Sequence, residues 1–80
     1  MKFIDIGLGN LAAASRIVSV ASPDTAPIKR LVQDAKDEGR AIDVSCGLKT
    51  RSVLVTDCGL VLLSSLETEE IRSRLRAAAE

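Results

Sequence analysis

The sequence predicts an α+β domain with a small mixed or antiparallel sheet of about five strands, one central helix and a C-terminal helix. Short β-branched or alternating apolar runs and two amphipathic segments follow one another in the order β β α β β β α. Only short connections separate these elements, and the chain contains no internal repeat or low-complexity linker. We therefore expect residues 1–80 to form a single domain.

The first two strands lie on either side of a glycine-rich turn. Residues 2–6 place Ile4 and Ile6 on one face of a short strand, which ends at the turn formed by residues 7–10. Residues 16–21 are β-branched and alternate in polarity, which predicts the second strand.

The central helix is predicted between a proline-containing start and a glycine stop. Thr25, or Ser22 before Pro23, can cap its N-terminus, Pro27 lies in the first turn, and Gly39 marks its end. Four apolar residues recur with helical spacing and predict one buried face. They are Ile28, Leu31, Val32 and Ala35.

Three further strands and a helix complete the predicted domain. We expect strands at 41–46 and 51–57, joined as a hairpin by the turn 47–50, and a returning strand at 60–65, so that the three form a meander. A C-terminal helix is expected at about 67–79, because acids occupy its first turn, arginines its later turns, and one stripe is apolar. That stripe is Ile71, Leu75 and Ala78.

The composition predicts a thin core that needs support from outside the subunit. Apolar residues make up 46% of the chain, but Phe3 is its single aromatic residue, so the core must consist of Val, Leu, Ile and Ala. Cys46 and Cys58 are far apart and the chain has no histidine, which excludes a tetrahedral zinc site and favours two reduced, partly buried thiols over a disulfide. Self-association is then the expected stabilising device.

The segment GLGNLA, residues 7–12, matches the dinucleotide fingerprint G-x-G-x-x-G/A. That fingerprint requires a helix after the glycine turn, and the space before the strand at 16–21 is too short for one. We expect Gly7 and Gly9 to adopt positive φ in a loop between strands, or to help this loop present Arg16 to a partner. No cofactor is expected.

Catalysis has no support in the sequence. The chain lacks histidine, its serines have no evident base, and its acid pairs at 37–38 and 69–70 lie on predicted exposed helix faces. We expect no enzymatic activity and no metal site. No signal peptide or apolar run long enough to span a bilayer is present in the sequence, so a cytoplasmic location is expected.

Cations are unevenly placed although eleven Lys and Arg balance eleven Asp and Glu. Lys29 and Arg30 lie in the first turns of the central helix, where the helix dipole disfavours them; solvent, an acid of a neighbouring subunit or a phosphate could compensate. Lys49 and Arg51 lie in the turn GLKTRS, which is either a binding surface for phosphates or a soluble turn.

Several segments, in register over nearly the whole chain, resemble the RemA family of bacterial regulators of extracellular matrix and biofilm genes. The matching segments are IGxGN (6–10), Arg16 before the second strand, SPxxAPIKR (22–30), the DA with its downstream glycine (34–39), and Thr50-Arg51. The resemblance implies a fold similar to LytTR-type DNA-binding domains and assembly into a closed homo-oligomeric ring, an octamer or a near neighbour. It also implies that the ring binds double-stranded DNA and bends the duplex or wraps it around its rim.

The resemblance implies that Arg16 and the basic turn 47–51 contact DNA. The turn departs from the family pattern GRRTR, because Leu48 replaces the first arginine and Lys49 the second. Lysine keeps a charge but loses the planar fork of arginine, so we expect weaker DNA affinity per subunit. The leading expected contacts are Arg16, Lys49 and Arg51, with Lys29 and Arg30 secondary. The alternative is a ring-forming structural or protein-interaction module that has lost DNA binding.

Overall fold

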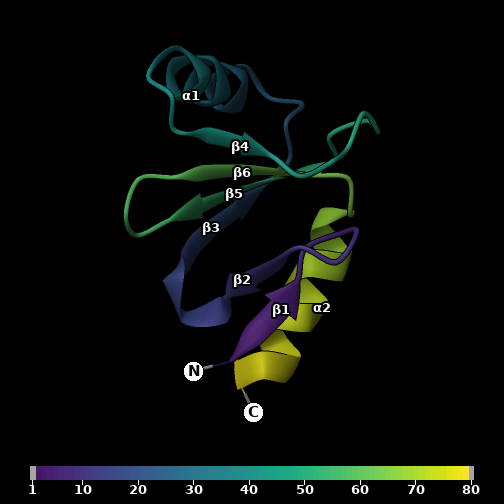
Figure 1. The fold of residues 1–80 in the computed structure, drawn as a ribbon. Helices are drawn as coiled ribbons and strands as arrows, with labels where there is room; N and C mark the ends of the chain where they lie inside the picture. Colours follow the sequence, from purple (N-terminus) through teal and green to yellow (C-terminus); the bar gives the residue numbers. More distant parts are fainter. Residues whose placement is uncertain (1, 80) are drawn as a thin grey trace.

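The computed structural model describes residues 2–79 and shows an α+β fold, as predicted (Figure 1). Six strands form two sheets within this part of the chain, instead of one sheet of about five strands. The elements are β1 (Phe3–Asp5), β2 (Leu11–Ala13), a 3₁₀ turn (Ala14–Arg16), β3 (Ile17–Ala21), α1 (Ala26–Asp37), β4 (Ala41–Asp43), β5 (Ser52–Thr56), β6 (Val61–Ser64) and α2 (Thr68–Ala79).

The larger sheet is mixed and is covered on both faces. Its strand order is β3-β5-β6-β4, and only the β4–β6 pair is parallel. Helix α1 lies over one face, while α2 and the β1–β2 hairpin lie on the other (Figure 1). Because side chains alternate along a strand, Val53 packs with the α1 side and Leu54 with the α2 side.

The core consists of aliphatic side chains, as the composition predicts. The α2 side is built around Ile4, Ile6, Leu54, Leu62 and Ile71. The α1 side is built around Ala35, Val53, Val61 and Leu63. Phe3 is 58% exposed, so the single aromatic residue contributes little to either cluster.

The predicted meander is wrong. The expected strand 41–46 ends at Asp43, and β4 pairs with β6 in parallel instead of forming a hairpin with β5. Eight connecting residues span up to about 26 Å, whereas strands two positions apart in a sheet are about 10 Å apart, so the 44–51 loop can pass the intervening β6. The composition of β6 fits its central position between β5 and β4, because all four of its residues are buried and both faces of the sheet are covered there.

The N-terminal region contains a strand that the sequence did not predict. Residues 11–13 form β2, which pairs antiparallel with β1. The turn between them confirms the expected role of the glycines: φ is 125° at Gly7 and 81° at Gly9. Ile6 N–H donates to the Asn10 carbonyl and closes the turn, so the chain continues as a strand and not as a nucleotide-binding helix.

Both predicted helices are confirmed, with boundaries close to those expected. Helix α1 begins after Thr25, whose side chain makes no capping hydrogen bond, and the chain turns away at Gly39, where φ is 74°. Helix α2 begins one residue later than expected. Within the described residues, neither helix has the length and hydrophobicity needed to cross a bilayer.

The thiols are free, as predicted, but the expectation that they are partly buried is wrong. Cys46 and Cys58 are both exposed, each in a turn, because the apolar positions of the neighbouring strands are filled by Val and Leu. Thr56 Oγ1 lies 3.2 Å from the Cys58 sulfur, and this hydrogen bond lowers the pKa of the Cys58 thiol.

A thiol-reactivity assay tests this placement. We expect Ellman's reagent to modify both cysteines in the folded protein without denaturant, and Cys58 to react rapidly near pH 7.5 because its lowered pKa raises its thiolate fraction. The variants Cys46→Ser and Cys58→Ser assign the two rates. Modification only after unfolding would show that the thiols are covered.

Candidate nucleic-acid interface

The basic segment lies in a loop whose tip has a defined shape. Leu48 N–H donates to the Ser45 carbonyl at 3.0 Å, and the two residues between them have positive φ, 52° at Cys46 and 85° at Gly47. Positive φ at both central positions is the type I′ turn. The tip of the loop is therefore at 45–48, earlier than the predicted turn 47–50.

The base of the loop is anchored to the sheet. Ser45 is buried, and both its N–H and its hydroxyl donate to the Asp43 carboxylate, which lowers the pKa of that carboxyl. Val44 N–H donates to the Leu63 carbonyl at 2.9 Å, and Arg51 N–H donates to the Ser64 carbonyl at 2.8 Å. Because both ends are fixed to β6, the turn presents its side chains in a set direction.

Lys49 and Arg51 lie on the same side of this loop. Both line a small groove shared with Ser22, Asp24, Thr50, Glu67 and Thr68. Arg51 Nη1 lies 2.7 Å from Glu67 Oε1, which neutralises part of its charge. Lys49 is exposed and forms no ion pair with any acid among residues 2–79.

The two cations of α1 face different directions. Lys29 lines a depression of about 300 Å³ that also includes Lys36 and Thr50. Arg30 instead lines a depression with Asp34 and Glu38 on another face of α1. Lys29 forms no ion pair within the described part of the chain, whereas Arg30 lies among acids.

Thr50 borders both the loop groove and the Lys29 depression, so these cations belong to one region of the surface. We call this region the Thr50 surface and define it as Lys29, Lys36, Lys49, Thr50 and Arg51. Sequence reasoning missed Lys36. Lys36 follows Lys29 by seven residues, which puts the two lysines on one helix face, and this spacing is visible in the sequence.

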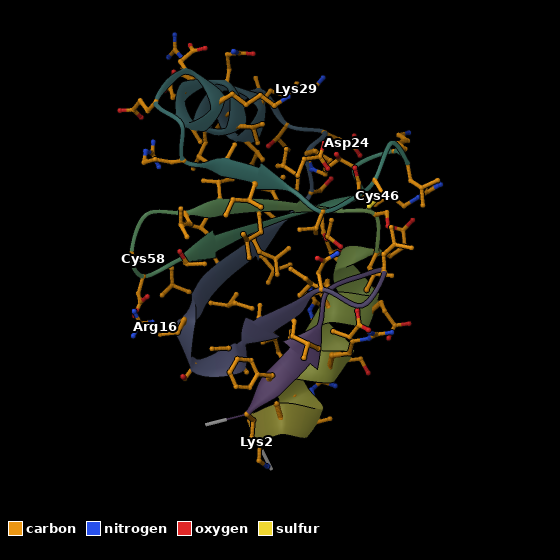
Figure 2. All side chains as sticks on the ribbon, viewed as in Figure 1. Lys2, Arg16, Asp24, Lys29, Cys46 and Cys58 are labelled. Atoms are coloured by element: carbon orange, nitrogen blue, oxygen red, sulfur yellow. The ribbon has the colours of Figure 1, made fainter. Side chains whose placement is uncertain are left out.

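Arg16 is not part of the Thr50 surface. It ends the 3₁₀ turn before β3, and its Nε lies 3.0 Å from Asp57 Oδ1 in the β5–β6 turn. Figure 2 shows Arg16 near Cys58 at one end of the sheet, with Cys46 and Asp24 at the other. Arg16 lies beside Asp57, so the six residue steps from Arg51 to Asp57 along β5 separate the two arginines by about 20 Å.

The remaining chemistry of the described residues is sparse. No group of three His, Cys, Asp or Glu side chains within residues 2–79 is placed to hold a metal ion. The acid pairs at 37–38 and 69–70 are exposed, as the sequence predicts. The uneven placement of cations is therefore the feature that characterises this surface.

Comparison with known proteins identifies the family. Residues 3–75 match the family described as "Extracellular matrix regulatory protein A-like" (RemA-like). The chain is 49% identical over 75 residues to a "Putative regulatory protein" of Geobacillus thermodenitrificans, covering 94% of this chain and 86% of the relative. It is 48% identical over 77 residues to a protein of the same description from Heliobacterium modesticaldum, covering 96% and 85%. A further one, from Clostridium botulinum, is 45% identical over 80 residues, covering 100% and 88%. The chain belongs to the RemA-like family of regulatory proteins.

Proposed function

We propose that this protein is a DNA-binding transcriptional regulator that acts as a homo-oligomeric ring. The observation that carries the proposal is the Thr50 surface: in a chain of zero net charge, exposed cations from α1 and the 44–51 loop gather in one region. Lys29 and Lys49 have no acid partner within residues 2–79, so a phosphate can occupy that role.

Self-association explains how a subunit with few cations can bind a polyanion. Each subunit offers a small number of phosphate contacts, and a closed assembly presents them repeatedly to one duplex. The ring also accounts for the position of Arg16. Because Arg16 and the Thr50 surface lie at opposite ends of the sheet, head-to-tail assembly brings Arg16 of one subunit towards the Thr50 surface of the next.

Exposed apolar side chains on the hairpin support assembly. Phe3 and Leu11 are 58% and 65% exposed, and the register of β1 and β2 places them on the face opposite buried Ile4. Val18 on β3 is 64% exposed. A lone subunit leaves this surface in water, and contact between copies removes it.

Duplex titration combined with native mass spectrometry tests the proposal. We expect a closed oligomer that binds double-stranded DNA, with an affinity that falls steeply as salt rises from about 50 to 200 mM because each phosphate contact contributes a slope of about −0.9. A monomer at working concentration, or an assembled protein that does not bind DNA at low salt, contradicts the proposal.

A substitution at Asp57 tests the role of Arg16. Asp57→Asn removes the carboxylate that holds Arg16, and we expect DNA affinity to rise, by at most about fivefold because exposed ion pairs contribute little. The matched control is Glu69→Gln, which removes the same charge and releases Arg72 on α2 instead. An equal rise in both variants would show a general charge effect.

The second candidate function is a ring-forming structural or protein-interaction module. Leu48 favours it, since this leucine is 58% exposed at the tip of the loop and removes a cation from the family's basic turn. The same titration separates the two functions. An intact oligomer without DNA binding supports the module.

A further inference from the structure

Leu48 occupies an unusual position for an exposed leucine. It is 58% exposed and follows directly on the two positive-φ residues of the I′ turn. A non-glycine residue in the left-handed region, here Cys46, carries a conformational cost, and the anchored loop base maintains it. The result is an apolar side chain presented at a fixed tip.

The surroundings of Leu48 favour a polyanion as its partner. Lys49 follows immediately and Arg51 lies three residues on, while residues 44–50 contain no acid. The nearest acid before the turn, Asp43, is exposed, and its carboxylate accepts two hydrogen bonds from Ser45. An apolar tip flanked by cations matches the side chains that enter the minor groove and unstack a base step while neighbouring cations hold the phosphates.

A second leucine in a similar setting lacks this charge. Leu8 is 59% exposed in the β1–β2 turn and has positive φ, 54°. Both loops are anchored at Ser64, whose hydroxyl donates to the Ile6 carbonyl before the β1–β2 turn and whose carbonyl accepts from Arg51 N–H at the end of the 44–51 loop. No cation lies within five residues of Leu8 along the chain on either side. Leu8 is therefore a matched control for Leu48.

We propose that Leu48 is an apolar wedge that inserts between base pairs of duplex DNA and kinks it, with Lys49 and Arg51 contacting the flanking phosphates. This inference rests on the proposed DNA-binding function. The inference gives Leu48 a role in DNA binding, although this leucine replaces a cation of the family's basic turn. The wedge makes the protein select sequences and structures that kink easily, because the cost of unstacking is lower there.

The wedge is tested separately from DNA binding by comparing the affinities for an intact duplex and for a duplex that bends easily at one step. Fluorescence anisotropy is measured on an intact duplex and on the same duplex with a one-nucleotide gap at its centre. We expect the unmodified protein to prefer the gapped duplex by about tenfold or more, since the base step at the gap unstacks more easily than a step in intact DNA. Leu48→Ala and Leu48→Gln should reduce this preference to about one, and Leu48→Met should retain it.

The controls separate the possible failures. Leu8→Ala should keep both the preference and the oligomer mass. Binding of both duplexes with equal affinity by the unmodified protein overturns the wedge and leaves DNA binding intact, whereas binding of neither overturns the proposed function itself. A smaller oligomer in the Leu48→Ala variant identifies Leu48 as a subunit contact and also overturns the wedge.

Discussion

Replacing Lys49 by glutamine is expected to weaken duplex binding by about fivefold for each subunit in contact with the DNA at 0.15 M salt, because each lost phosphate contact removes a slope of about 0.9. When two subunits contact one duplex, the loss is on the order of 25-fold. Lys49 is chosen because it is exposed, lies at the anchored loop and forms no ion pair with acids among residues 2–79. Anisotropy titrations at several salt concentrations measure both the affinity and the slope.

Arg30→Gln is the matched control for this prediction. It removes the same charge, but Arg30 lies beside Asp34 and Glu38 on a face of α1 away from Thr50. We expect its affinity to stay within about twofold of the unmodified protein, because only general charge is lost. Equal losses from Lys49→Gln and Arg30→Gln would show that net charge, and not the Thr50 surface, governs binding.

The fold class could be predicted from local patterns, whereas the strand pairing could not. The apolar stripe of α1 and the glycine after it predict the end of that helix to within two residues of the observed one. No residue pattern within the 44–51 loop distinguishes a connection that passes β6 from a hairpin turn. The informative signal was the continuous apolar run of β6, which predicts a strand buried on both faces. Three-residue strands such as β2 are too short to show a period.

The candidate site was predicted residue by residue but not as an arrangement. Lys49 and Arg51 occur together in the sequence and also in the structure. Lys29 and Arg30 are neighbours in the sequence, yet the helix turns them to different faces, since successive residues differ by about 100° around its axis. The pairing of Arg16 with Asp57 depends on the register of β3 and β5, which connects residues 41 positions apart.

The largest effect on stability is expected from Ile71→Ala. Ile71 is the one buried residue of α2 within the described chain, is fully buried, and packs with Ile4, Ile6 and Leu54 beneath the sheet. Truncation to alanine leaves a cavity and costs about 2–5 kcal/mol, although alanine itself favours the helix.

A domain of this size is stable by only about 5 kcal/mol or somewhat more, so the Ile71→Ala subunit is expected to be largely unfolded unless assembly supports it. Urea unfolding followed by circular dichroism measures the change, and raising the protein concentration should recover part of the loss. Arg72→Ala is the control, because the adjacent Arg72 is exposed and forms a surface ion pair with Glu69. We expect that variant to stay within about 0.5 kcal/mol, as surface substitutions do. If Ile71→Ala were as stable as Arg72→Ala, α2 would not be held against the sheet by its apolar face.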